Sequence, residues 1–194
     1  FLVTLGGEHS ISQGAIKAYK EKYKRLSVLQ LDAHLDLMEQ FGGTRYSHAS
    51  VSRRVAEDLR CKVTSFGVRV ASKEEHNFLK NNKSKVSVFY ARDIYDNDSW
   101  HEEAIDTLED HVYITLDVDG FDPSIMPATG TPVPGGLGWY RVIDFLRKVY
   151  KEKKVVGMDV VELKPNSGNE APNFLSANLV YKNIGFYKKY TLLS

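Results

Sequence analysis

The sequence predicts an α/β fold, in which a mainly parallel sheet lies between two layers of helices in a three-layer α-β-α arrangement. Apolar runs typical of buried strands alternate with segments of helical periodicity along the chain. The strand-like runs are rich in Val, Leu and Ile, as expected when both faces of a parallel sheet are covered. Because we find no internal repeat and no linker, we expect a single domain over residues 1–194.

Each predicted element follows from its own local pattern. The apolar runs place strands at residues 1–5, 26–32, 63–70, 86–90, 112–118 and 155–161. Helical spacing places a first helix that begins near Ser10 or Ser12 and ends at about residue 23. Further helices are expected at residues 51–59, 72–81, 100–108, 139–150 and 171–187. Ser10 or Ser12 is expected to cap the first helix, and Ser72 with Glu75 predicts a capping box. The segment 122–138 carries four prolines and four glycines, so we expect irregular structure there.

Composition excludes several classes of protein. Lys plus Arg is 26 and Asp plus Glu is 25, giving a formal net charge of +1, so the sequence indicates no nucleic-acid partner. Cys61 is the only cysteine, which excludes a disulfide framework and a cysteine-based zinc site. No apolar run reaches the roughly 18 residues of a membrane span. A cytoplasmic location without membrane contact fits these observations.

Three side chains that are common metal ligands follow the second strand at a spacing of two residues. They are Asp32, His34 and Asp36 in the run Leu29-Gln30-Leu31-Asp32-Ala33-His34-Leu35-Asp36. On an extended backbone, residues at this spacing point to one side. Two carboxylates held together repel each other unless a cation lies between them. Taken alone, a polar loop after a strand explains the stretch equally well.

Other predicted strands also end in polar clusters, which parallel strands bring to the same edge of the sheet. The clusters are Glu8 with His9, Asp117 with Asp119, and Glu162. Two divalent cations would balance the four aspartates Asp32, Asp36, Asp117 and Asp119, whose buried charge is otherwise very costly. A shell of four carboxylates and two imidazoles favours Mn²⁺ over Zn²⁺, although ligand type alone leaves zinc open. Asp122, before Pro123, is assigned to a turn.

Three motifs together resemble the ureohydrolase family of arginases and agmatinases, over essentially the whole chain. The motifs are Gly6-Gly7-Glu8-His9-Ser10, Asp32-Ala33-His34-Leu35-Asp36 and Leu116-Asp117-Val118-Asp119-Gly120-Phe121-Asp122-Pro123. The resemblance implies an arginase/deacetylase-like fold and two Mn²⁺ ions per subunit. It implies that the metal ligands are His9, Asp32, His34, Asp36, Asp117 and Asp119, with Asp32 and Asp117 bridging the ions. It also implies that Glu162 grips the substrate guanidinium and that His48 shuttles protons beside it.

Within the family, the chain is most similar to agmatinases, which implies cleavage of agmatine to urea and putrescine. The similarity lies in Gly7-Glu8-His9-Ser10 and in the runs around His48 and Thr131. Guanidinobutyrate, formiminoglutamate and arginine remain alternative substrates, with Arg45 a possible receiver of a carboxylate. A non-catalytic, metal-stabilised interaction protein is an alternative of another class. The family's N-terminal segment has no counterpart here, so we expect the chain to be a fragment.

A catalytic hypothesis assigns three roles. Asp36 orients a hydroxide supplied by the metal pair, and Glu162 holds the guanidinium through charge-assisted hydrogen bonds. His48 relays protons, because the ordinary pKa of histidine suits that role. The expected partner is therefore a small guanidino substrate. The resemblance further suggests a homo-oligomer, a trimer or a hexamer.

Overall fold

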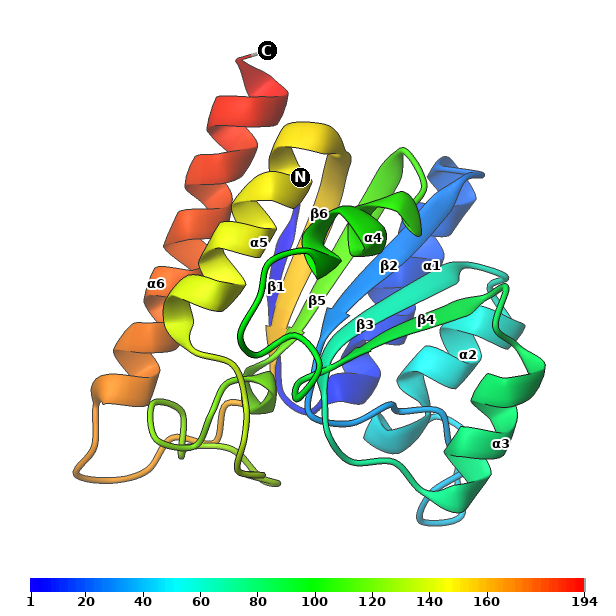
Figure 1. The fold of residues 1–194 in the computed structure, drawn as a ribbon, viewed down its shortest axis with the longest axis horizontal. Helices are drawn as coiled ribbons and strands as arrows, with labels where there is room; N and C mark the ends of the chain where they lie inside the picture. Colours follow the sequence, from blue (N-terminus) through cyan, green and yellow to red (C-terminus); the bar gives the residue numbers. More distant parts are fainter. Residues whose placement is uncertain (194) are drawn as a thin grey trace.

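The structure, a computed structural model that describes residues 1–193, contains a six-stranded sheet in which every pair of neighbours is parallel (Figure 1). The strand order is β1-β6-β5-β2-β3-β4. The strands are β1 (Val3–Leu5), β2 (Leu26–Leu31), β3 (Lys62–Val68), β4 (Val86–Tyr90), β5 (His111–Asp117) and β6 (Lys154–Val161). The predicted α/β fold class is therefore confirmed.

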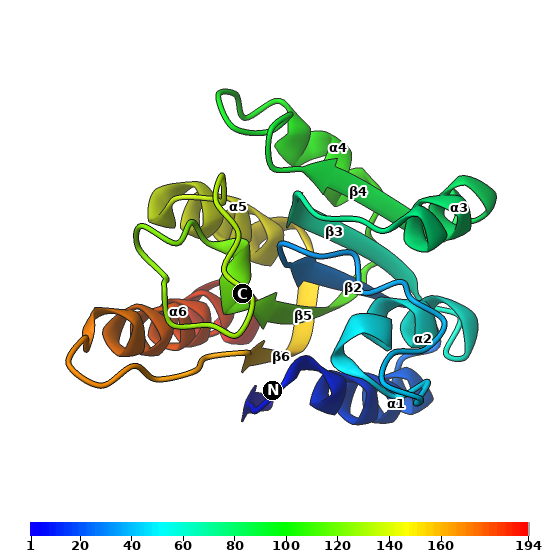
Figure 2. The same ribbon diagram turned by 90° about the horizontal axis from the view of Figure 1, so that it is seen from below.

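Helices cover both faces of this sheet, as Figure 2 shows from below. They are α1 (Ser12–Lys22), α2 (Val51–Glu57), α3 (Lys73–Asn81), α4 (Trp100–Asp106), α5 (Trp139–Glu152) and α6 (Ala171–Tyr187). The first three lie on one face and the last three on the other. Their bounds agree with the predicted segments to within two residues. None of the described helices is long and apolar enough to cross a membrane.

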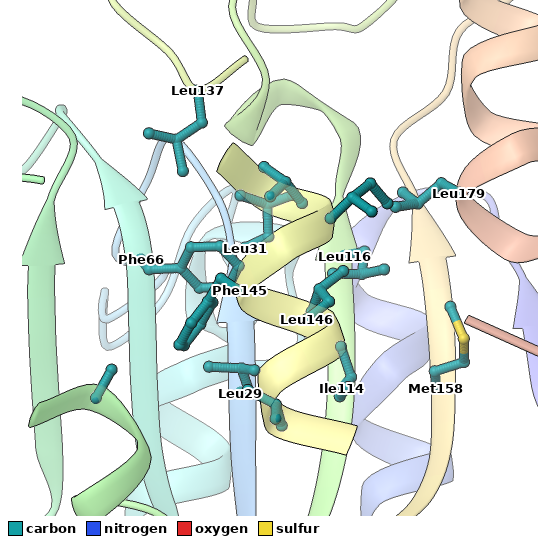
Figure 3. Close-up of a cluster of buried hydrophobic side chains, with 14 of the residues drawn as sticks. Leu29, Leu31, Phe66, Ile114, Leu116, Leu137, Phe145, Leu146, Met158 and Leu179 are labelled. Carbon is teal, nitrogen blue, oxygen red and sulfur yellow. The ribbon is translucent and has the colours of Figure 1, made fainter. Parts of the chain in front are cut away.

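The core forms two apolar layers, one on each face of the sheet. Leu29 and Leu31 of β2 pack with Phe145 and Leu146 of α5 in the larger layer (Figure 3). Their neighbours on the same strand, such as Val28, belong to the opposite layer with residues of α1, α2 and α3. This division follows from the strand period of two, which sends alternate side chains to opposite faces.

The predicted caps were right for one helix and wrong for another. The Ser72 side chain accepts a hydrogen bond from the Glu75 N–H, and the Glu75 carboxylate accepts one from the Ser72 N–H, which confirms the capping box. Neither Ser10 nor Ser12 caps α1, which has no side-chain cap. A 3₁₀ turn, η1 (His9–Ile11), precedes α1 instead, and the Glu8 side chain accepts from the Ser10 N–H at its start.

All strands point toward one edge of the sheet, and the loops that follow them gather there (the lower edge in Figure 1). Gly120 follows β5 and lies close to the end of β2. A Cβ atom at Gly120 would lie 2.5 Å from Leu31 Cγ and 2.9 Å from the Asp32 backbone nitrogen. Only glycine therefore allows the turn after β5 to approach the end of β2 this closely.

We expect Gly120→Ala to lower the free energy of unfolding by about 1–3 kcal/mol, because the added methyl group overpacks a closed contact. Gly14→Ala is the matched control, since Gly14 lies in α1 with open space around it. That change should stabilise the protein by about 0.5–1 kcal/mol. Urea denaturation without metal measures both, and equal stability of the two variants would contradict the packing argument.

Candidate metal centre

A cavity of about 570 Å³ opens at the edge where the strands end. Its lining includes most of the residues that the sequence singles out, namely Glu8, His9, His34, Asp36, His48, Asp117, Asp119 and Glu162. Asp32 lies beneath them and is fully buried. The fold therefore brings together side chains from the ends of β1, β2, β5 and β6, as the parallel arrangement predicts.

One group of ligand-type side chains forms around His9. Its Nδ1 atom lies 3.0 Å from Asp36 Oδ2, 3.2 Å from Asp32 Oδ2 and 3.4 Å from Asp117 Oδ2. His9, Asp32 and Asp36 each offer an atom within 4.8 Å of the others, which is close enough to hold one metal ion. Within the described residues, His9 Nδ1 is buried without a hydrogen-bond partner. Such an atom, facing carboxylate oxygens, fits a metal ligand.

A second group forms around His34 and shares Asp32 with the first. His34 Nδ1 lies 3.0 Å from Asp119 Oδ2 and 3.4 Å from Asp32 Oδ1. Asp32, His34 and Asp119 again offer atoms within 4.8 Å of one another. The two oxygens of Asp32 thus face different groups, as a carboxylate shared by two ions would. For Asp117, a bridging role stays a prediction.

The chain leaves strand geometry directly after β2, which is why the three side chains of the second motif spread out. Asp36 has a positive φ of 52°, a left-handed conformation that is uncommon for residues other than glycine. It directs Asp36 toward His9, whereas His34 lies in the other group. The segment Asp32–Asp36 therefore contributes side chains to both groups of candidate metal ligands instead of one.

The ionisable groups of the centre strongly shift each other's pKa values. Burial and the charge of Asp32 raise the pKa of Asp36 to about 7. Burial opposes protonation of His34, but Asp119 and Asp32 outweigh it and raise its pKa to about 11. Burial likewise opposes protonation of His9, yet the facing carboxylates of Asp117, Asp32 and Asp36 hold its pKa well above the ordinary value. Such crowding is what two divalent cations would relieve.

A buried network of hydrogen bonds among Tyr113, Thr115 and Asp159 contacts the Nε2 side of the His9 ring. The Thr115 hydroxyl donates to Asp159 Oδ1 at 2.6 Å, and the Tyr113 hydroxyl donates to Asp159 Oδ2 at 2.8 Å. His9 Nε2 lies 2.9 Å from Thr115 Oγ1. Since the Thr115 proton is committed to Asp159, Thr115 accepts from His9 Nε2–H. Once Nδ1 gives up its proton, this arrangement directs its lone pair at the carboxylates, as a metal ligand requires.

Asp32 has a support of its own in Gln30. The Gln30 Nε2 atom donates to Asp32 Oδ2 at 2.7 Å, while its Oε1 atom accepts from the hydroxyls of Ser52 and Ser65. The two hydroxyl donors fix the orientation of the amide. Sequence reasoning missed Gln30, Thr115 and Asp159, although each is a polar residue inside an apolar strand, and that pattern was the available signal.

Of the four remaining candidates, Glu162 and His48 line the cavity, whereas Arg45 and Asp122 do not. Glu162, with a positive φ of 66°, accepts a hydrogen bond from the His9 N–H at 2.7 Å through Oε1. The His48 side chain is 48% exposed, and its Nδ1 atom lies 3.5 Å from Glu8 Oε2. Arg45 does not line the cavity, because Glu39 and Asp58 pair with it. Asp122 accepts from the Ser124, Gly135 and Gly136 N–H groups, in keeping with the assignment to a turn.

We expect metal binding to release protons and to tighten as the pH rises. Near pH 7 the metal-free centre holds protons on His9 and His34, whose pKa values are raised, and part of Asp36 is protonated too. A metal must displace these protons, and a lower pH adds more of them. Calorimetric titration of Mn²⁺ in buffers of different ionisation enthalpy should show a net release of about two to three protons per chain, from His9, His34 and part of Asp36. No net release at pH 7 would contradict this description of the centre.

Thr115→Val should weaken metal binding about 10–100-fold, because His9 loses the acceptor that sets its tautomer. Thr64→Val is the matched control, since Thr64 in β3, two strands away from β5, also forms a hydrogen bond through its hydroxyl, with Thr107 at 2.6 Å. Both variants should lose about 1–3 kcal/mol of stability. Metal titration separates them, and equal metal affinity in the two would exclude the role of the network.

Comparisons with known proteins place the chain in a family. A sequence model described as "Arginase family" matches residues 1–185. The chain is 39% identical over 189 residues to the N(1)-aminopropylagmatine ureohydrolase of Synechocystis sp., covering 96% of this chain and 61% of that protein. It is 38% identical to the agmatinase of Pyrococcus horikoshii, with 94% of this chain and 62% of that protein covered.

Solved structures agree with the sequence comparisons. The agmatine ureohydrolase of Thermoplasma volcanium superposes with a TM-score of 0.84 at 36% identity, covering 97% of this chain and 62% of that structure. The chain thus spans 61–62% of the length of these relatives. From its sequence model, its relatives and its fold, the chain belongs to the arginase family.

Proposed function

We propose that this chain forms the catalytic part of a binuclear manganese hydrolase that cleaves the guanidino group of agmatine to urea and putrescine. The observation that supports it most is the pair of ligand groups that share Asp32. Two ions held this way would offset the charge of Asp32, Asp36, Asp117 and Asp119. The oxygen-rich set of donors favours Mn²⁺.

The lining of the cavity supports a substrate whose tail is an amine. Its described residues include no lysine or arginine, so a substrate carboxylate would find no cationic partner there. Glu8 supplies negative charge near the mouth, and Met38 and Phe41 supply apolar surface for a methylene chain. Arginine and guanidinobutyrate carry a carboxylate and therefore fit less well than agmatine.

A second candidate substrate is N(1)-aminopropylagmatine, which extends the amine tail. Relatives from Synechocystis sp. and Thermus thermophilus, 39% and 40% identical to this chain, are named as ureohydrolases of that compound. The longer tail adds a further amine and no carboxylate. The same acidic and apolar lining therefore suits both substrates.

The side chains around the cavity divide the work of hydrolysis. When bound, the metal pair would supply hydroxide near neutral pH by lowering the pKa of water. Asp36 orients this nucleophile by accepting its hydrogen bond. Glu162 holds the guanidinium through Oε2, since Oε1 already accepts from the His9 backbone. His48, half exposed at the mouth, passes a proton to the leaving amine and exchanges protons with solvent.

Location and assembly complete the proposal. A cytoplasmic protein fits the single buried cysteine, Cys61, which needs no disulfide partner. A trimer or hexamer of identical chains stays the expected assembly. Neither a nucleic acid nor a membrane is expected as a partner.

We expect a urea-release assay with added Mn²⁺ to show turnover of agmatine or N(1)-aminopropylagmatine, and much slower turnover of arginine and guanidinobutyrate. The reason is the absence of a cationic partner for a carboxylate among the lining residues. Formamide release from formiminoglutamate is measured in parallel, and a chelator removes the metal in the control. Faster turnover of arginine than of agmatine and N(1)-aminopropylagmatine would refute the proposed substrates. Metal binding without any turnover would favour the non-catalytic alternative.

Asp117→Ala should abolish both metal loading and urea release, because it removes a carboxylate that faces His9 at 3.4 Å. Asp110→Ala is the matched control, as Asp110 is exposed at the opposite end of β5. Metal content after dialysis and urea formation report the two effects. Full activity of the Asp117 variant would refute the assignment of these residues as a catalytic metal centre.

A further inference from the structure

We propose that Arg69 is a positioning residue for one metal position of the two, the one formed by Asp32, His34 and Asp119. The inference rests on the proposed function, because it presupposes two metal positions. Arg69 lies just beyond β3, after a bulge at Gly67, where the register between β3 and β4 shifts. It does not line the metal cavity.

The backbone of Arg69 holds the second motif. The N–H groups of Arg69 and Val70 both donate to the Ala33 carbonyl oxygen, at 2.9 Å and 3.0 Å. Ala33 stands between the ligands Asp32 and His34. Val70 also forms an isolated parallel bridge with His34, which extends the pairing of β2 and β3 beyond the strands. The position of His34 therefore depends on the segment that carries Arg69.

The side chain of Arg69 holds the third motif through backbone carbonyl groups. Its Nη2 atom donates to the carbonyl oxygens of Asp119 at 2.6 Å and Phe121 at 3.2 Å. Nη2 and Nε both donate to the Val133 carbonyl, at 2.8 Å and 3.1 Å. The planar guanidinium can serve carbonyl groups of two segments at once, which the single ammonium of a lysine matches poorly.

Asp119 is the point at which these restraints meet. Its Oδ1 atom accepts from the Ala33 N–H at 2.9 Å, and its Oδ2 atom accepts from the Thr131 hydroxyl at 3.1 Å. Arg69 thus restrains Ala33 through its backbone, Asp119 through the carbonyl, and the loop of Thr131 through Val133. Arg69 therefore restrains the two segments, around Ala33 and Thr131, whose hydrogen bonds orient the Asp119 carboxylate.

Apart from Asp32, which both groups share, the group around His9 has its own contacts. His9 is held by Thr115 and by the carboxylate of Glu162, and no hydrogen bond of Arg69 among residues 1–193 reaches His9, Thr115 or Glu162. Loss of the Arg69 side chain should therefore weaken one position selectively. A residue needed only for general stability would show no such selectivity.

The test compares Arg69→Met, which keeps an apolar stem, and Arg69→Lys, which keeps a charge, with Arg141→Met. Arg141 is the matched control because its guanidinium also donates to backbone carbonyls, those of Tyr95 and Asn97, away from the cavity. Each full chain is titrated with Mn²⁺ by calorimetry, and bound metal is counted after dialysis. Circular dichroism of the metal-free proteins checks folding.

We expect the unmodified chain and Arg141→Met to bind two ions, and both Arg69 variants to keep one ion while the second binds about 10–100-fold more weakly. Two ions bound with unchanged affinity by a folded Arg69 variant would overturn the inference. So would equal weakening of both ions, or unfolding of both Arg69 variants while Arg141→Met folds, because Arg69 would then serve the whole fold. Failure of the unmodified chain to bind two ions would instead refute the proposed function.

Discussion

The structure depends on one electrostatic constraint, which is the burial of four aspartates at a single edge of the sheet. Asp32, Asp36, Asp117 and Asp119 are 0–7% exposed. Uncompensated charge in such surroundings costs several kcal/mol per group, even after the protein relaxes. Only a compensating cation or proton makes such an arrangement stable.

The surrounding chain meets this constraint with directed donors that leave room for cations. The His34 N–H donates to Asp32 Oδ1, the Ala33 N–H to Asp119 Oδ1, and the Asp119 N–H to Asp117 Oδ1. Each of these donors comes from the backbone of the motifs themselves. The carboxylates are therefore oriented before any metal arrives, and their other lone pairs face the histidines and the cavity. Preorganisation of this kind explains why the motifs are so compact in sequence.

Much of the fold, and the gathering of the candidate ligands at one end of the strands, was predictable, because both follow from local patterns. Apolar runs and helical periods gave the elements, and parallel strands brought His9, Asp32, Asp117 and Glu162 to one edge. The supporting residues were not predictable in the same way. Thr115 is 106 positions from His9, so only the fold shows their contact.

Two local features also escaped prediction for physical reasons. Ser10 and Ser12 have the right chemistry to cap α1, but the 3₁₀ turn that presents His9 replaces the cap geometry. The role of Arg69 depends on a bulge at Gly67, whose φ of 92° redirects the chain beyond β3. In both cases the demands of the site override the rule that the sequence alone suggests.

The same constraint bears on the choice of substrate. An acidic edge with no lysine or arginine among its described lining residues attracts a cation and repels a carboxylate. Glu162 connects the two tasks, because the carboxylate proposed to hold the guanidinium also accepts from the backbone of His9. Through that bond, the substrate anchor and a metal ligand share one rigid frame. In the proposed function, displacing either group would shift the guanidinium carbon relative to the two metal positions, so one geometry would set both binding and catalysis.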